Sequence, residues 1–462
     1  MKKINTSPIS GADEFLPEIQ ATFDSFKTKI SETYSSHGYR NVETPFIERT
    51  EILFAKAGGD TEKQIYEVKK TGDKTATKAT QALRFDHTVP LARYVIEHEN
   101  DLNFPFKVQQ IGVNFRGERA QKGRFREFYQ CDIDVIGRDK LPLAYDADVI
   151  ATLLETFRVF DLGTPVLARI SNRKILAGLL EALNLEDKTS AISNIIDHAE
   201  KVTPEQTKVA LEDLQLAKIQ VEVILNFIDL SGPRSEIVKA LENLEIKNAT
   251  FELGVSELDQ TLGLLEAMGF EHEITADLKI IRGLDYYTGT VFEFILPEHK
   301  NLGSVCGGGR YENLTKHFSN KTFPGVGGSI GLSRLFFTLT ENGLLNSATQ
   351  KLTEYALIPF SEQEIEYAFK LARELRAKNH SADVVLIDKK LGEKLAYAAK
   401  IAANGIVIGE KEVQTGKLQV KDFATGKSRT FNFLTEDLLE TDSPKADPTD
   451  FWTDPSEPST FL

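Results

Sequence analysis

The chain has 462 residues, 41% of them hydrophobic and 27% charged, which is typical of a globular protein with two or three domains. Its formal net charge of −14 argues against a nonspecific coat on nucleic acid, although one local basic surface could still bind an RNA. No apolar run approaches the roughly 20 residues that span a bilayer, and the only two cysteines form no CxxC pair, so we expect no membrane partner, no thiolate metal site and a cytoplasmic location.

The N-terminal region predicts a loose arm over residues 1–12 and an amphipathic helix over 13–37. Apolar side chains recur there at steps of three and four, at Phe15, Ile19, Phe23, Phe26, Ile30 and Tyr34. Gly38 is a suitable C-cap. Pro45 lacks an N–H and suits a strand end or an edge strand, and a plain strand-to-loop proline is equally consistent with the local sequence.

Paired strands are predicted at 65–68 and 82–85, and a helix follows within RFDHTVPLARYV, residues 84–95. Thr88 can cap this helix, whose first turn contains Pro90. Asp86 lies just before that turn. It is either an ordinary capping side chain or a ligand-binding carboxylate, and the local sequence leaves both interpretations open.

A cluster of basic residues lies between two predicted strands, 106–111 and 127–136. The loop NFRGERAQKGRFREF, residues 114–128, contains five cations, namely Arg116, Arg119, Lys122, Arg124 and Arg126. Arginine forks match phosphate oxygens, and an aromatic side chain such as Phe128 can offer a face to a base. A phosphate-binding loop and a solvated, charged hairpin tip both fit this pattern.

The second half of the chain begins with a predicted helix at 144–160, a strand at 165–170 and a helix at 172–183, followed by short helices over 186–262. The segment IRGLDYYTGTVFEF, 281–294, then places an arginine, a carboxylate and two tyrosines within six residues, on an expected hairpin or strand edge. It suits a pocket wall beside an anionic reaction centre, and an ordinary strand with two half-buried tyrosines fits it as well.

Two glycine-rich segments follow. The glycines of SVCGGGRYENL, 304–314, would permit a close backbone approach to a ligand. PGVGGSIGLSRLFFTL, 324–339, predicts a strand that enters a helix bearing Arg334, and it matches neither a dinucleotide fingerprint nor a P-loop. From residue 354 strands and helices alternate, which predicts a separate α/β domain.

In this order the segments resemble a class II aminoacyl-tRNA synthetase of the histidyl-tRNA synthetase family, from about residue 8 to 435. The region around Pro45 resembles motif 1, residues 115–128 motif 2 and 327–334 motif 3, while RGLDYYTGTVFEF and GGRYENL resemble the histidine-specific signatures. The implied fold is α/β: an antiparallel catalytic sheet flanked by helices, with a helical insertion and a C-terminal α/β anticodon-binding domain. The implied limits are 1–185 and 263–345 for the catalytic core, 186–262 for the insertion, 353–435 for the anticodon-binding domain and 436–462 for a disordered acidic tail.

The resemblance also implies the residues that bind each substrate. Those expected to contact ATP are Arg116, Glu118, Phe128 and Arg334. Those expected to contact histidine are Asp86, His87, Thr88, Arg116, Gln130, Asp134, Arg282, Tyr286 and Tyr287. Arg116 and Arg282 are the expected catalytic residues, His87 would contribute its backbone only, and no protein metal site is implied. The imidazole would lie between Asp134 and Tyr287, so that each ring nitrogen has a partner.

The activity that the resemblance implies is ligation of L-histidine to tRNA(His) through a histidyl-adenylate, with ATP as substrate and Mg²⁺ accompanying it. The family also implies a homodimer formed through the motif-1 region, and no DNA partner. Two other functions remain to be separated from this one: a non-catalytic regulatory subunit of histidine biosynthesis, and a pure RNA-binding module. The sequence has Asp86 and Asp134 where bacterial members often have Glu, and it lacks the terminal Glu-Gln common in the anticodon-binding domain.

Overall fold

The structure is a computed structural model that describes residues 4–55, 62–72, 79–119, 123–160, 162–281, 287–312, 315, 318–345 and 353–432. The chain divides into two compact units. The first comprises residues 1–16 and 22–347, and the second comprises 348–462 together with 17–21. We describe each unit by itself.

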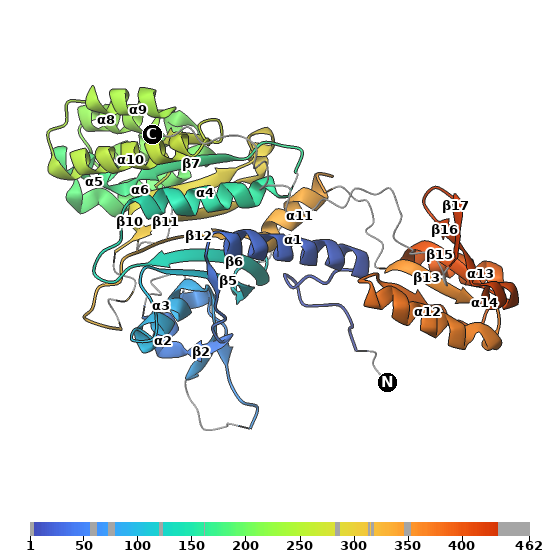
Figure 1. Cartoon of the computed structure of the whole chain (residues 1–462). Coiled ribbons are helices and arrows are strands. Elements are labelled where there is room, and N and C mark those ends of the chain that lie inside the picture. Colours follow the sequence, from blue (N-terminus) through green and yellow to red (C-terminus); the bar gives the residue numbers. More distant parts are fainter. Residues whose placement is uncertain are drawn as a thin grey trace, which may run out of the picture. The chain divides into compact units, whose positions relative to one another are not determined.

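The first unit is built on a nine-stranded sheet that is antiparallel from β5 through β7 (Figure 1). Its strands, in spatial order, are β1 (Arg40–Asn41), β5 (Phe106–Phe115), β6 (Glu127–Ile136), β12 (Gly325–Ile330), β11 (Cys306–Tyr311), β10 (Tyr287–Ile295), β7 (Leu167–Asn172), β9 (Ile274–Asp277) and β8 (Ser231–Gly232). The tyrosine-bearing strand β10 therefore lies inside the sheet, between β11 and β7. The expected hairpin is confirmed, because β10 pairs antiparallel with the next strand, β11, whereas the alternative expectation of a strand edge was wrong.

Helices α1 (Pro17–Ser36), α4 (Ala144–Arg158) and α11 (Leu332–Glu341) supply apolar side chains to the main core (Figure 1). Because side chains alternate along a strand, Cys131, Ile133 and Val135 of β6 all enter this core. Both cysteines of the chain are buried free thiols, and burial raises their pKa values. One face of β6 is thus committed to packing, which leaves its other face for chemistry.

Helix α1 is shorter at its start than its apolar pattern predicts. It begins at Pro17 and not at residue 13, since proline is favoured in the first turn of a helix. Phe15 and Ile19, expected on the buried face, are 37% and 41% exposed. The predicted end is confirmed, because Gly38 follows the helix with a φ of +83°, a conformation that glycine adopts without strain.

A helical region follows β7. Its helices are α5 (Arg173–Ala182), α6 (Thr189–His198), α7 (Pro204–Asp213), α8 (Lys218–Ile228), α9 (Arg234–Glu242) and α10 (Ala249–Ala267). Asn172 ends β7 and caps α5 by accepting a hydrogen bond from the Lys174 N–H at 3.0 Å. The helix was expected to begin at residue 172, and it begins one residue later, at Arg173. The apolar faces of these helices join the main core. The proposed domain limits stay a prediction.

A small sheet of order β2 (Ile47–Arg49), β4 (Gln81–Leu83) and β3 (Glu67–Val68) confirms the predicted strand pair, with helices α2 (Thr50–Phe54) and α3 (Thr88–Glu97) beside it. The expectation that Thr88 caps α3 was wrong. The Asp86 carboxylate instead accepts the Val89 N–H at 3.0 Å, so Asp86 is the capping side chain.

The second unit is a separate α/β layer with its own apolar core. Its strands are, in order, β14 (Ala382–Val384), β13 (Thr353–Pro359), β15 (Ala402–Ile408), β16 (Lys417–Asp422) and β17 (Ser428–Asn432). Helices α12 (Ile365–Ala377) and α13 (Leu391–Ile401) were expected, and the short α14 (Glu410–Thr415) was not. The α/β fold expected from the sequence is confirmed. No helix among the described residues is long and apolar enough to cross a membrane.

Candidate active site

The open face of β6 carries a row of functional side chains. Phe128, Gln130, Asp132 and Asp134 are spaced two residues apart, so they point to the same side of the sheet. The neighbouring strand β12 has small residues opposite them: Gly327 pairs with Asp134, and Ser329 pairs with Asp132.

Gly327 gives the Asp134 carboxylate its space. A Cβ atom at residue 327 would lie 2.1 Å from the Asp134 Oδ1, so any side chain there would force the carboxylate or the strand to move. The glycine of β12 therefore lets the carboxylate lie across the strand. The row on β6 and the small residues opposite it together form the floor of a substrate site.

The glycines of β11 have different roles from one another. A Cβ at Gly308 would lie 2.1 Å from the Gly327 carbonyl oxygen, and one at Gly309 would lie 2.7 Å from the Thr290 carbonyl oxygen. These two glycines therefore make room for neighbouring strands, whereas Gly307 lines a cavity of about 400 Å³. Of the three glycines expected to allow a close approach of the backbone to a ligand, Gly307 therefore remains the candidate, and this approach stays a prediction.

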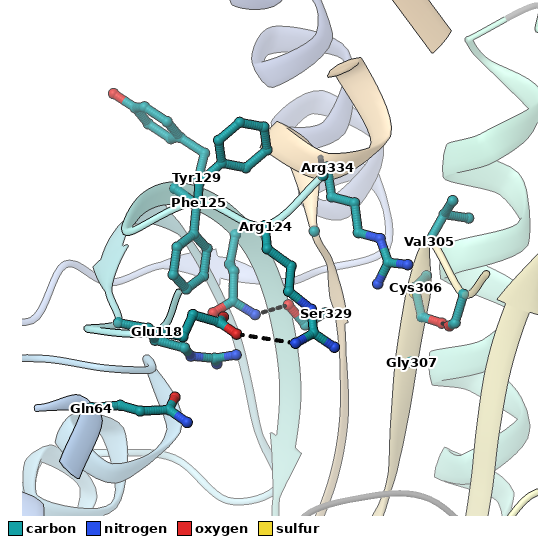
Figure 2. Close-up of a pocket in the computed structure, with 16 residues that line it drawn as sticks. Gln64, Glu118, Arg124, Phe125, Tyr129, Val305, Cys306, Gly307, Ser329 and Arg334 are labelled. Carbon is teal, nitrogen blue, oxygen red and sulfur yellow. Dashed lines mark hydrogen bonds and ion pairs between the residues drawn. The ribbon is translucent and has the colours of Figure 1, made fainter. Parts of the chain in front are cut away.

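A cavity of about 400 Å³ opens over the motif-2-like loop and the start of α11. Figure 2 shows the Glu118 carboxylate and the Arg124 guanidinium facing each other in this cavity, 3.5 Å apart, with Arg334 extending from α11. The Arg334 side chain is exposed and donates a hydrogen bond to the Leu302 carbonyl oxygen at 2.8 Å. Cations and one carboxylate on an open cavity suit a nucleotide with several phosphates.

Arg116 lies against Phe128 in the same cavity. Its guanidinium carbon is 5.0 Å from the Phe128 ring centroid, and its Nε donates to the Phe85 carbonyl oxygen at 3.1 Å. Arg116 therefore covers one face of the ring that was expected to stack on adenine. A base bound here would use the other face of Phe128 or displace the guanidinium.

The N-terminal arm is fastened to the motif-2-like loop, so the expectation of a loose arm was wrong at residues 10 and 11. The Gly11 carbonyl oxygen accepts hydrogen bonds from the N–H groups of Arg126 and Glu127, at 2.7 and 3.2 Å. The Arg126 side chain donates to the carbonyl oxygens of Ser10 and Glu118, at 3.3 and 3.1 Å.

A second pocket, of about 30 Å³, adjoins the cavity, because Gly307 and Ser329 line both. Its other lining residues are Thr88, Asp132, Asp134, Tyr287, Tyr311, Gly327 and Gly328. The Tyr311 hydroxyl donates a hydrogen bond to the Asp134 Oδ1 at 2.9 Å. Burial raises the pKa of Asp134 well above its usual range, the nearby Asp132 carboxylate raises it further, and the Tyr311 hydrogen bond opposes this rise.

The other polar groups of this region form a connected network. The Gln130 Oε1 accepts from Asn114 at 2.9 Å, and its Nε2 donates to the Ser329 hydroxyl at 2.8 Å. Asp86 is buried, and burial raises its pKa, while the Val89 N–H and the charge of Arg116 oppose the shift. These contacts hold Gln130 and Asp86 in fixed orientations beside the small pocket.

The His87 side chain is buried, with its Nδ1 atom 3.1 Å from the Asp132 Oδ2. A backbone-only contact with histidine was expected for His87, and it stays a prediction. The His87 side chain contacts the Asp132 carboxylate, while its Nε2 atom has no hydrogen-bond partner among the described residues.

Two predicted site residues, Arg282 and Tyr286, lie outside the described residues, as does Asp285. The residues on either side of them are held by Arg173, at the start of α5. Its guanidinium donates to the carbonyl oxygens of Ile281 and Tyr287, at 3.2 and 2.8 Å.

Sequence reasoning assigned no role to Arg173, Asp132, Ser329 or Tyr311. The two-residue spacing from Gln130 to Asp134 could have identified Asp132. Tyr311 lay within a quoted signature, whereas no local pattern marked Arg173.

Within the described ranges, no group of three or more His, Cys, Asp or Glu side chains could hold a metal ion. The large cavity contributes one carboxylate, that of Glu118, against three arginines. This donor set suits anionic phosphates and does not suit a protein-bound cation.

The fold is that of an aminoacyl-tRNA synthetase, as comparison with known proteins shows. A family model described as "Histidyl-tRNA synthetase" matches residues 11–335, and one described as "Anticodon binding domain" matches residues 354–435. Curated proteins named "Histidine--tRNA ligase" from Clostridium tetani and Clostridium acetobutylicum are 42% and 41% identical to the chain. The alignments cover 94% and 93% of this chain and 98% of each relative.

The crystal structure of a histidyl-tRNA synthetase from a Nostoc species is also similar, with a TM-score of 0.85 and 35% identity, over 93% of this chain and 97% of that one. A Bacillus halodurans structure described as an ATP phosphoribosyltransferase regulatory subunit/histidyl-tRNA synthetase, at 21% identity and a TM-score of 0.73, shares the fold. The chain belongs to the histidyl-tRNA synthetase family, which confirms the resemblance found in its sequence.

Proposed function

We propose that the two adjoining cavities hold the two small substrates of histidine–tRNA ligation, the reaction of the family to which the chain belongs. ATP binds in the larger cavity, and L-histidine binds in the smaller pocket. The observation that carries this assignment is the row of side chains on β6, which runs from an aromatic ring at Phe128 to a buried carboxylate at Asp134.

In the larger cavity, Glu118 and Phe128 hold adenine, and Arg334 lies against the base and the distal phosphates. Arg116 contacts the α-phosphate and the histidine carboxylate. Its guanidinium is held by the Phe85 carbonyl oxygen beside Asp86, within reach of both substrates. A preorganised cation at that junction stabilises negative charge as it develops on the phosphate.

In the smaller pocket, Asp134 and Tyr287 bind the two imidazole nitrogens, and Tyr286 lines the ring. Asp86, Thr88 and Gln130 hold the α-ammonium group. A ligand without ring nitrogens would leave the buried Asp134 carboxyl group without its substrate partner, and this discriminates strongly against such a ligand.

The reaction proceeds in two steps that need no side-chain nucleophile. The histidine carboxylate attacks the α-phosphorus of ATP, pyrophosphate leaves, and histidyl-adenylate remains. A hydroxyl of the terminal adenosine of tRNA(His) then attacks the acyl carbonyl carbon, and AMP leaves. Arg282 is the second cation beside the α-phosphorus, so catalysis consists mainly of positioning and electrostatic stabilisation.

Mg²⁺ would enter with ATP and would supply positive charge beside its phosphates, while Glu118 is the carboxylate that lines the cavity. The residues of this chain bind, orient and neutralise the phosphates. The second unit, which matches the anticodon-binding family, binds the tRNA anticodon. Two buried free thiols fit a reducing cytoplasm.

The motif-1 region forms a homodimer interface in our proposal. Phe46 and Ile47 follow Pro45 and are 44% and 48% exposed in the single chain, which suits a surface covered by a second copy. Sedimentation of the Ile47→Asp variant should show a shift toward monomer. An unchanged dimer, with Val209→Asp as the matched control on an exposed helix residue, would contradict this interface.

Histidine-dependent ATP–pyrophosphate exchange by the purified chain tests the proposed function. The ligase predicts exchange with histidine, whereas a regulatory subunit predicts histidine binding without exchange, and an RNA-binding module predicts neither. A folded protein that gives no exchange would overturn the enzymatic assignment. Retention of Arg116, Arg334 and the second unit favours the ligase.

A further inference from the structure

Asp132 is a carboxylate of the small pocket that the roles proposed above leave unused. It lies on β6 between Gln130, assigned to the histidine ammonium, and Asp134, assigned to the imidazole. Residues two apart on a strand are separated by roughly 7 Å. Asp132 is therefore placed beside the part of the substrate that joins its ammonium group to its ring.

Neighbouring side chains fix the orientation of Asp132. Its Oδ2 atom is 3.1 Å from the His87 Nδ1, and its Oδ1 atom accepts a hydrogen bond from the Ser329 hydroxyl. The Asp132 side chain is 8% exposed and lines the pocket. A carboxylate has about four acceptor positions, so these two contacts leave capacity for a donor inside the pocket.

Acidic groups are buried around the small pocket, and cations lie near them. Three buried carboxylates, Asp86, Asp132 and Asp134, lie in this region. Buried carboxylates are costly unless a cation or several donors pair with them. The Arg84 guanidinium is committed to the oxygens of Thr44 and Val113.

Arg116, the other nearby cation, donates to the Phe85 carbonyl oxygen. The three carboxyl groups outnumber these two arginines, and among them Asp132 has the His87 ring as a further basic neighbour. The α-ammonium group of a bound histidine would add a cation to this set.

We propose that Asp132 is a further substrate-binding residue, which holds the histidine α-ammonium together with Asp86 and leaves Asp134 free for the imidazole. His87 and Ser329 are positioning residues that aim the Asp132 carboxylate. This inference rests on the proposed function, because it requires histidine in the small pocket.

Three ligands distinguish binding of the ammonium group from binding of the imidazole ring. L-Histidine has ammonium, carboxylate and imidazole groups, histidinol lacks the carboxylate, and 3-(imidazol-4-yl)propionate lacks the ammonium. Their affinities for the full chain are measured by calorimetry and by competition in pyrophosphate exchange. Asp132→Asn should weaken histidine and histidinol binding by about ten- to a hundredfold, the loss expected for one hydrogen bond to a charged group. Binding of the propionate should change less than about threefold, because it offers Asp132 no cation.

Asp134→Asn is the matched control, the same substitution two residues further along the same face. It should weaken all three ligands alike, since all three contain the imidazole. Asp132→Asn would overturn the proposal if it weakened the propionate as much as histidinol, or if histidinol binding did not change. If the asparagine variant did not fold, Asp132→Ser would be measured against the same three ligands.

The His87→Gln variant tests whether Asp132 contacts the substrate itself or acts only by holding His87. It retains the Asp132 carboxylate, so it should weaken histidinol less than Asp132→Asn does. An equal loss would mean that Asp132 acts only by holding His87. Absence of histidine binding by the wild-type chain would instead contradict the proposed function itself.

Discussion

Replacing Tyr311 with phenylalanine removes one hydroxyl beside the carboxylate that we assign to the substrate imidazole. The ring is 1% exposed and packs where a Cβ at Gly325 would come within 2.4 Å of it, so the phenyl ring keeps its place. The change deletes the hydrogen bond from the Tyr311 hydroxyl to the Asp134 Oδ1 without opening a large cavity.

The expected effect follows from the pKa of Asp134. Burial already raises this pKa, and the Tyr311 hydrogen bond opposes the rise. A hydrogen bond to a charged group contributes about 1.5–3 kcal/mol, and one pKa unit corresponds to about 1.36 kcal/mol. The pKa of Asp134 in the variant should therefore rise further. The acid limb of kcat/KM for histidine should move to higher pH, by about one to two pH units if the whole hydrogen-bond energy is lost.

The free energy of unfolding should also depend on pH through the protonation of Asp134. A carboxyl group with a raised folded-state pKa stabilises the fold below its unfolded pKa of about 4, and this contribution is lost as pH rises through the folded pKa. Because the variant raises the folded pKa further, its deficit in unfolding free energy should be largest at neutral pH and should shrink toward pH 4.

Pyrophosphate exchange as a function of histidine concentration and pH tests this prediction, with thermal unfolding measured alongside. Tyr34→Phe is the matched control, because the Tyr34 hydroxyl donates to the Cys131 carbonyl oxygen on the same strand at 3.1 Å. It should cost stability without moving the acid limb. An acid limb that stays in place in Tyr311→Phe would refute the role given to the Tyr311–Asp134 pair.

Three other changes separate the remaining assignments. Arg282→Ala should slow pyrophosphate exchange by about 10²–10³-fold. Histidine binding, measured by calorimetry, should stay within about tenfold, and near-normal exchange would remove the electrostatic role of Arg282. A chain ending at residue 352 should keep exchange but lose tRNA charging, whereas equal loss of both would assign the second unit to folding or dimerisation. Gly327→Ala would place a Cβ 2.1 Å from the Asp134 Oδ1, so the histidine KM should rise about five- to 150-fold, the effect of roughly 1–3 kcal/mol of overpacking. Gly392→Ala, with no atom within 4 Å, is its control, and an equal KM in the two variants would contradict the crowding argument.

Local sequence patterns predicted the strand at 127–136 at its observed limits and placed Asp86 at a helix start. Both features depend on neighbours a few residues away. Local patterns could not predict that β6 pairs with β12, because Gly327, the partner of Asp134, is far along the chain. The space for the Asp134 carboxylate depends on this pairing.

The errors have similar physical causes. An apolar period alone extended α1 toward residue 13, but Pro17 starts the helix and leaves Phe15 half exposed. The sequence of residues 287–295 predicts a strand but not its neighbours, so it could not show that β10 lies inside the sheet. The Arg116–Phe128 contact depends on side-chain conformation, which spacing does not reveal.

The hydrogen bonds at Gly11 have a practical consequence for how the protein is produced. The carbonyl oxygen that receives two N–H groups of the motif-2-like loop belongs to the segment that precedes α1. A purification tag fused before this segment, or a deletion of residues 1–12, would act on Arg126 and, through it, on the Glu118 backbone. ATP kinetics should therefore be compared between chains tagged at either end before a weak KM is attributed to the site itself.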